Sequence, residues 1–193
     1  MLPCVGRGAL DASPTTSASL STAFEVFSLP SASASPSSLF VVQIRGSIVP
    51  GRQRDHAARL AAFLSDLRVG RVLLLASIPS AFAPRPDRTL LVLPAERPDA
   101  EAQAQAAACA ARGIDRLDPA LASDRPVAER RLPPWPLLAA LAARGLPALS
   151  LVAVASEGDN ARDGLEMAQT AAAVAHVHAD TWRAPASWAQ SMY

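Results

Sequence analysis

The chain has 193 residues, with 18 basic and 17 acidic side chains and a formal net charge of +1. This near-neutral balance argues against a nucleic-acid binder that works by neutralising phosphates. Half of the residues are apolar, and the length suits a domain with a full hydrophobic core. No apolar run approaches the roughly 18–20 residues of a membrane helix, so we expect no membrane partner.

Cysteine content and the N-terminal composition bear on the compartment. Two cysteines, Cys4 and Cys109, are too few for a disulfide framework, and we expect free thiols in a reducing compartment. The N-terminus lacks the charged and apolar regions of a secretory signal. Residues 1–38 are rich in serine and alanine and carry few charges, so the sequence leaves organellar targeting open.

The first third of the chain predicts a loop, a hairpin and a helix. Residues 11–21 are small, polar and aperiodic, which is typical of a loop. Residues 24–29 and 39–44 are β-type runs separated by a Ser-rich segment, so they predict a hairpin. Residues 52–68 predict an amphipathic helix, because apolar side chains recur at helical spacing. These side chains are Ala57, Leu60, Ala61, Leu64 and Leu67.

Strands and helices alternate in the middle of the chain. Residues 71–76 and 89–93 are apolar runs that predict buried strands, and the proline-rich residues 78–87 predict a loop. Residues 98–111 predict an Ala/Gln-rich helix. Residues 118–134 predict an exposed excursion without apolar periodicity. A further helix is expected to open at the prolines around Trp135, since proline is tolerated in a first helical turn.

Residues 148–178 form the unit around which the chain is organised. The apolar run 148–155 predicts a strand buried on both faces. The turn 156–160 supplies N-cap residue types, and its glycine permits a sharp reversal. A helix follows, with an expected apolar stripe of Leu165, Ala168, Ala172 and Ala175. Such turns lie at the carboxyl edge of an α/β sheet, where function usually collects.

Strands that alternate with helices, and that are apolar on both faces, predict an α/β sandwich with a mostly parallel central sheet. Sequence signals of chemistry are few. The chain has no phosphate loop, dinucleotide glycine fingerprint or nucleophile elbow. Histidine occurs only at 56, 176 and 178, and the Cys and His spacings fit no zinc pattern. We therefore expect neither a metal ion nor a cofactor.

Two features are open to more than one interpretation. Glu157 and Asp159 could form an acid/base pair, although a structural turn is favoured because no histidine or lysine lies near them in sequence. A catalytic grouping assembled across the fold stays open. The tryptophans of the C-terminal segment could cover the edge of the core. Alternatively, they could anchor a partner, since Trp and Tyr dominate interface hot spots.

Several segments resemble the proteasome assembly chaperone 2 family. The turn 156–160, Ser-Glu-Gly-Asp-Asn, resembles the family's Glu-Gly-Asp-Asn signature after an apolar strand. Residues 182–188 resemble its closing segment. Residues 24–30 with 39–45 are similar to its hairpin, and residues 2–6 to a loop upstream of that hairpin. The matches follow the family order and span nearly the whole chain.

The resemblance implies a non-catalytic chaperone of the cytoplasm and nucleus, without metal or cofactor. It implies a heterodimer with proteasome assembly chaperone 1, which binds 20S proteasome α subunits, promotes α-ring assembly and blocks wrong ring association. The implied fold is a three-layer α/β/α sandwich that is nucleoside-phosphorylase-like but lacks the active site. The residues it marks as structural or interface positions are Ser156, Glu157, Gly158, Asp159 and Asn160. Those it marks as tail contacts with partners are Trp182, Arg183, Pro185, Trp188, Met192 and Tyr193.

The chain also departs from the family pattern. The family domain begins with a strand–helix–strand unit before the match at Leu2, so we expect an N-terminally incomplete domain. The expected organisation is a loop remnant at 1–21, an α/β chaperone domain at 22–181 and a tail at 182–193. Family chaperones insert a hydrophobic–Tyr–any-residue ending between α subunits. Here Met192-Tyr193 has no final residue, so the sequence leaves that insertion open.

Two rival hypotheses remain. One is a hydrolase or nucleoside phosphorylase-like enzyme on the same fold, which requires convergent polar groups in a pocket near Glu157 or Asp159. The other is a truncated product that does not fold alone. The sequence does not specify which surface would bind which partner.

Overall fold

The structure is a computed structural model that describes residues 6–7, 20–21, 24–29, 39–44, 46–80, 90–94, 99–117, 134–158 and 160–177. The chain divides into two compact units. The larger unit comprises residues 53–184, and the smaller one comprises residues 1–52 together with 185–193.

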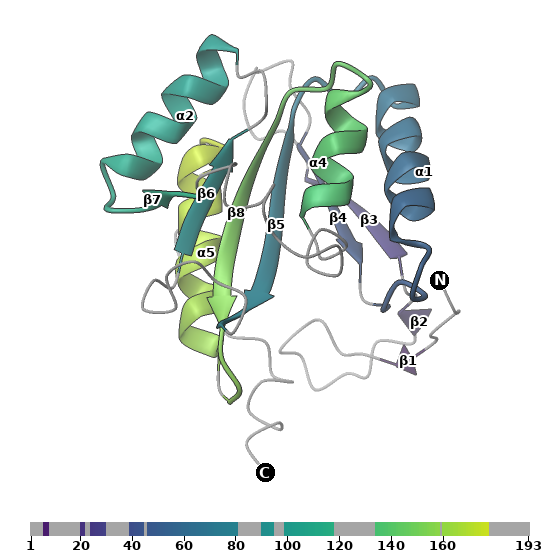
Figure 1. The fold of residues 1–193 in the computed structure, drawn as a ribbon, viewed down its shortest axis with the longest axis horizontal. Coiled ribbons are helices and arrows are strands. Elements are labelled where there is room, and N and C mark those ends of the chain that lie inside the picture. The colour runs from purple at the N-terminus through teal and green to yellow at the C-terminus, as the bar shows by residue number, and fades with distance from the viewer. Residues whose placement is uncertain are drawn as a thin grey trace. The chain divides into compact units, whose positions relative to one another are not determined.

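The larger unit is built on a four-stranded sheet in the order β5-β8-β6-β7 (Figure 1). β5 (Val72–Pro79) runs parallel to β8 (Ala148–Ala155). β6 (Leu90–Pro94) runs parallel to β7 (Asp115–Arg116). The pairing of β6 with β8 is antiparallel. The prediction of a mostly parallel sheet is confirmed, with one antiparallel pairing at its middle.

The predicted strand 148–155 coincides with β8, which lies between two other strands. Every side chain from Ala148 to Val154 is buried. The run has one polar member, Ser150, and its hydroxyl donates a hydrogen bond to the carbonyl oxygen of Leu74 at 3.2 Å. The buried hydroxyl is therefore satisfied, which removes the main cost of placing it in the core.

One face of the sheet is covered by α2 (Ala100–Ala110) and α5 (Ala161–Val174). Side chains from both helices pack against alternate residues of β8, because successive side chains of a strand point to opposite faces. The buried cluster on this face consists of Val92, Cys109, Ile114, Leu149, Leu151, Ala153 and Val174.

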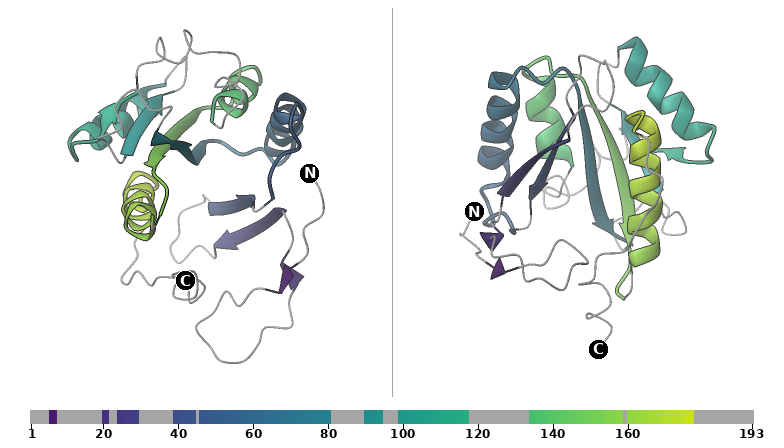
Figure 2. Two further views of the ribbon diagram at one scale, coloured as in Figure 1. Left: turned by 60° about the horizontal axis from the view of Figure 1, so that its bottom comes forward. Right: turned by 180° about the vertical axis from the view of Figure 1, so that it is seen from behind.

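The opposite face is covered by α4 (Trp135–Ala142). Trp135 and Leu138 of this helix pack against a second buried cluster, formed by Ile78, Leu117, Val152 and Val154. α1 (Gln53–Asp66) packs against α4. Helices thus lie on both sides of the sheet (Figure 2), and the predicted three-layer α/β/α arrangement is confirmed.

The predicted apolar stripe of the last helix is wrong. The side chains of α5 that are buried or packed in the core are Met167, Thr170, Ala171 and Val174, whereas Leu165 is 39% exposed. Ala161, Ala168 and Ala172 fall on the same side of this helix as Leu165, so a stripe built on small residues selects the wrong face. The larger Met167 and Val174 share one side, and packing them against the sheet buries more apolar area.

Other predicted boundaries shift where strand pairing overrides composition. β5 continues through Ser77, Ile78 and Pro79 because these residues pair with the end of β8. The predicted amphipathic helix is confirmed as α1, with Ala57, Leu60, Ala61 and Leu64 buried, while Leu67 follows the helix and is 52% exposed. Of the predicted excursion 118–134, all but Pro134 lies outside the described residues, and Pro134 is buried.

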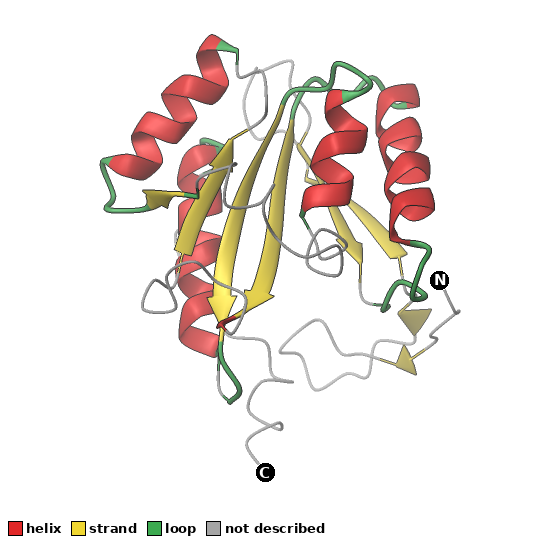
Figure 3. Ribbon diagram, viewed as in Figure 1, coloured by secondary structure: helices red, strands yellow, loops and turns green. Residues whose placement is uncertain are grey.

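The smaller unit contains the predicted hairpin, in which β3 (Phe24–Leu29) pairs antiparallel with β4 (Leu39–Ile44) (Figure 3). β1 (Gly6–Arg7) pairs with β2 (Leu20–Ser21). This pairing corrects the end of the predicted loop 11–21, and residues 11–19 lie outside the described residues. Val26 and Phe27 are both exposed, and consecutive strand residues point to opposite faces. The hairpin therefore presents apolar side chains on both of its faces.

An ionic cluster joins the start of β5 to the start of α2. Arg71 contacts Asp99 at 2.8 Å and Glu101 at 2.9 Å. Asp99 is also the N-cap of α2, where its carboxylate accepts a hydrogen bond from the backbone of Ala102. The hydrogen bond from Arg71, and then the one from Ala102, hold the pKa of Asp99 below its usual value. This carboxylate therefore ties a strand to the helix that covers it.

We expect Leu151→Ala to lower the free energy of unfolding by about 2–5 kcal/mol, because truncating a fully buried leucine removes core contacts and leaves a cavity. The matched control is Leu75→Ala, since Leu75 is the direct register neighbour of Leu151 on β5 yet is 46% exposed. Urea denaturation monitored by circular dichroism measures both variants. Equal losses for the two would contradict the assignment of β8 as the buried strand.

The Asp99 cluster makes stability depend on pH. A lowered folded-state pKa means that the stabilisation is present above the ordinary aspartate pKa and is lost as the pH falls through the folded value. We expect Asp99→Asn to melt below the wild type at pH 7, and the gap to close at acidic pH below that value. Asparagine can still cap α2, so Asp99→Ala should melt lower still. A gap that persists undiminished in acid would refute the ionic role.

Candidate functional site

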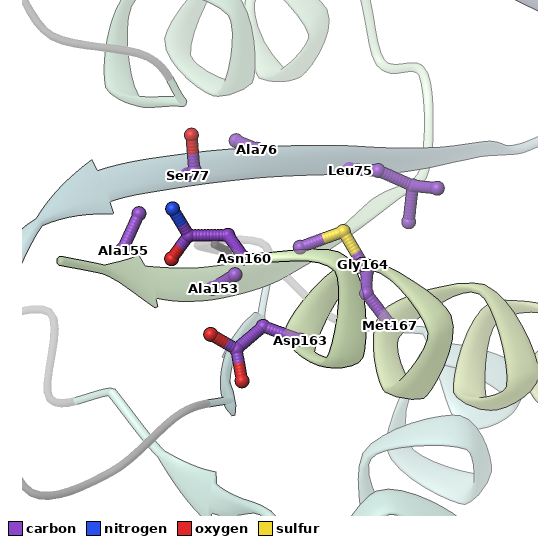
Figure 4. A pocket seen from close by; sticks show the side chains of 9 residues that line it. All are labelled: Leu75, Ala76, Ser77, Ala153, Ala155, Asn160, Asp163, Gly164 and Met167. Atoms are coloured by element: carbon purple, nitrogen blue, oxygen red, sulfur yellow. The ribbon is translucent and has the colours of Figure 1, made fainter. Parts of the chain in front are cut away.

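A pocket lies at the carboxyl end of the parallel pair β5 and β8, beside the start of α5 (Figure 4). Its volume is about 390 Å³. The position follows from the topology, because parallel neighbours end at the same edge and the chain must turn there to enter its helix. The lining residues are Leu75, Ala76, Ser77, Ala153, Ala155, Asn160, Asp163, Gly164 and Met167. This set is called the corner pocket below.

The turn between β8 and α5 is held by Asn160. Its side-chain amide donates to the carbonyl oxygens of Ser156, at 3.0 Å, and Gly158, at 3.1 Å. Asn160 occupies the N-cap position as the sequence predicts, but its side chain makes no capping hydrogen bond to the helix. It closes the preceding turn instead. Gly158 has a φ of +119°, a conformation that glycine adopts at far lower cost than other residues.

The corner pocket is polar at one end and apolar at the other. Asn160 lies between Ser77 and Asp163 in Figure 4, whereas Leu75 of β5 and Met167 of α5 lie toward the other end of the pocket. Asp163 is half-buried and Ser77 is exposed. Within the described part of the chain, neither the Ser77 hydroxyl nor the Asp163 carboxylate has a hydrogen-bond or ionic partner.

The predicted motif residues are divided by the structure. Ser156, Glu157 and Gly158 are exposed in the turn, and of the four described motif residues Asn160 alone lines the pocket. Asp159 lies outside the described residues. So do all the predicted tail contacts, which are Trp182, Arg183, Pro185, Trp188, Met192 and Tyr193. The proposed pairing of Glu157 with Asp159 is therefore untested.

The two described histidines, His56 and His176, are not among the residues that line the corner pocket. His56 lies on α1, where burial lowers its pKa and its Nε2 atom is buried without a hydrogen bond. His176 follows α5 and is exposed, and His178 lies outside the described residues. Within the described ranges, no three His, Cys, Asp or Glu side chains are grouped to hold a metal ion.

Cys109 is a free thiol inside the core between α2 and α5. Burial raises the pKa of this thiol, which disfavours the thiolate that a nucleophile requires. Its role is packing.

Among the helices that the structure describes, none is both long and apolar enough to cross a bilayer.

Two residues of the corner pocket, Ser77 and Asp163, are not among the site residues predicted from the sequence. Ser77 adjoins a proline-rich segment that predicts a loop, and only its pairing with Ala153 places it at the sheet edge. Asp163 lies away from the apolar stripe that the sequence predicts for the last helix, and the observed rotation of α5 brings it to the pocket. Its position in the first turn of a helix after a central strand was the one available signal.

These features define the class of the larger unit as a three-layer α/β sandwich with a pocket at its carboxyl edge. No protein-family model matches the chain, and no curated protein matches it. A solved structure from Thermoplasma acidophilum, a protein of unknown function, is similar with a TM-score of 0.56 at 12% identity. That match covers 90% of this chain, which spans 65% of the Thermoplasma chain.

A second similar structure is PbaA of Pyrococcus furiosus, described as an archaeal homolog of proteasome-assembly chaperone. Its TM-score is 0.48 at 11% identity, and the match covers 73% of this chain and 56% of PbaA. The match to the Thermoplasma structure shows that this chain shares the fold of that protein.

We expect Gly158→Ala to lower the free energy of unfolding by about 1 kcal/mol or more, since a β-carbon strains a backbone at positive φ. No atom lies within 4 Å of the added carbon, so the loss reports backbone strain alone. Gly70→Ala is the matched control, because its site is equally open and its φ is not positive. Thermal melts of both variants measure the difference, and a neutral Gly158→Ala would contradict the turn geometry.

Proposed function

We propose that this protein is a proteasome assembly chaperone of the chaperone 2 type. The observation that carries the proposal is the ordered set of motif resemblances along the chain. Two of them fall on described elements of the kind that the family motif requires. The signature turn follows a strand buried on both faces, and the hairpin resemblance falls on β3 and β4. The Thermoplasma match supports the fold on which the proposal depends.

In this proposal the protein acts by presenting surface, and makes or breaks no bonds. It pairs with proteasome assembly chaperone 1, and the heterodimer binds α subunits of the 20S proteasome. Holding α subunits together raises their effective concentration for one another and promotes α-ring assembly. Occupying their surfaces blocks premature or wrong ring association. The proposed location is the cytoplasm and nucleus, where proteasomes are assembled.

The signature turn serves as a rigid corner in this proposal. Asn160 ties Ser156 and Gly158 into one closed loop, and β8 anchors that loop to the core. Ser156 and Glu157 are exposed on it, so they are available to a partner in a fixed position. Fixing an interface before binding lowers the entropy lost on association.

The rival enzyme hypothesis requires a nucleophile or bound water beside a general base. The corner pocket offers the Ser77 hydroxyl and the Asp163 carboxylate, but none of its described lining residues is a histidine. Neither group is bonded to the other in the structure, and nucleophile and base are ordinarily within hydrogen-bond reach. The described pocket therefore favours the chaperone over a hydrolase.

Co-expression with proteasome assembly chaperone 1 and 20S α subunits tests the proposal. We expect the chain to co-purify with chaperone 1 in a 1:1 complex, and the complex to retain α subunits. The control is the same experiment without chaperone 1, in which α-subunit recovery should fall. Failure of the folded chain to bind chaperone 1, or turnover of nucleosides or small esters that Asp163→Asn abolishes, would overturn the proposal.

A further inference from the structure

We propose that the corner pocket receives an arginine side chain presented by a partner subunit. The nature of the pocket follows from its own residues, while the identity of the partner as proteasome assembly chaperone 1 rests on the proposed function. Three observations carry the proposal. They are the hydrogen-bond acceptors at its polar end, the Asp163 carboxylate, which is unpaired among the described residues, and the apolar wall formed by Leu75 and Met167.

The polar end of the pocket offers hydrogen-bond acceptors. The Asn160 amide nitrogen donates both of its hydrogen bonds within the turn, to the carbonyl oxygens of Ser156 and Gly158. The group of this side chain that remains for a ligand is therefore its carbonyl oxygen. Asp163 can only accept when it is ionised, and the Ser77 hydroxyl can also accept. A ligand that fits such a set must be rich in donors, as a guanidinium is with five N–H groups.

The charge of the pocket selects a cation. The Asp163 carboxylate is half-buried and has no ionic partner among the described residues. Arg162, its neighbour in sequence, is exposed and does not line the pocket. Glu157 on the adjoining turn is likewise exposed and does not line the pocket. A guanidinium can bind the Asp163 carboxylate through two parallel hydrogen bonds.

The remaining wall suits the aliphatic part of the same side chain. Leu75 is 46% exposed although it lies on a strand of the central sheet, and Met167 borders the pocket from α5. Arginine lays its methylene groups along apolar surface while its charged end reaches polar groups. Figure 4 shows this division, with the polar side chains at one end and Leu75 and Met167 at the other.

Asp163 also has a purely structural role that the test must separate. A carboxylate in the first turn of a helix is stabilised by the helix dipole. α1 provides the comparison, because it has the same 14-residue length as α5 and also carries a single first-turn carboxylate, Asp55, which in addition pairs with Arg59 on the exposed face at 3.4 Å. Asp55→Asn should therefore reproduce any dipole effect of Asp163→Asn. It removes no group from the corner pocket.

The first experiment titrates the full chain with Nα-acetyl-arginine amide and follows backbone NMR resonances. We expect saturable shifts at Ser77, Ala153 and Gly164, at least fivefold weaker binding to Asp163→Asn, and unchanged binding to Asp55→Asn. The uncharged isostere Nα-acetyl-citrulline amide should bind at least fivefold more weakly than the arginine probe. Equal binding of the two probes, or shifts that survive Asp163→Asn, would overturn the assignment of the pocket.

The second experiment measures the affinity of the chain for proteasome assembly chaperone 1. We expect Asp163→Asn to weaken the complex at least tenfold and to reduce its salt dependence, whereas Asp55→Asn leaves both unchanged. Circular dichroism melts confirm that the two variants are folded to a similar extent. Wild-type protein that does not bind chaperone 1 overturns the proposed function. Wild-type binding that Asp163→Asn leaves intact overturns this use of the pocket.

Discussion

The burial of β8 on both of its faces is the constraint on which the larger unit depends. β5 and β6 pair with its two edges. Alternate side chains anchor α2 and α5 on one face and α4 on the other. Because β8 pairs on both edges and packs on both faces, it can hold only one register. A shift of β8 by one residue would exchange the side chains that it contributes to the two buried clusters. The remaining elements of the unit are arranged around that register.

The corner pocket follows from the same constraint. β5 ends beside β8 because the two strands pair in parallel over their whole length. The turn after β8 must then reverse within a few residues, and Gly158 and Asn160 make that reversal possible. The rotation of α5 that buries Val174 also brings Asp163 to the pocket. A polar site at this edge is thus a by-product of how the core is packed.

The hypothesis of a chaperone gives these surfaces a common purpose. A protein that works by binding needs exposed groups in fixed positions, and the closed turn at residues 156–160 supplies them in the larger unit. In the smaller unit, Val26 and Phe27 expose apolar side chains on opposite faces of the hairpin. Exposed apolar surface of this kind marks interaction sites in soluble proteins.

The sequence alone determined the order of elements and the identity of the central strand. The run 148–155 is too apolar and too rich in branched side chains for an exposed strand, and the spacing in residues 52–68 fits one helix face. Those signals are local, so they survive without knowledge of the fold. Only the tertiary structure decided the rotation of α5, because the helix offers two apolar sides, one formed by Leu165 with alanines and the other by Met167 and Val174. It also decided the length of β5, since pairing with β8 overrides the loop signal of Pro79. The sequence also could not show which side chains share the corner pocket. Ser77 and Asp163 are 86 positions apart in sequence, and only strand pairing and helix packing bring them together.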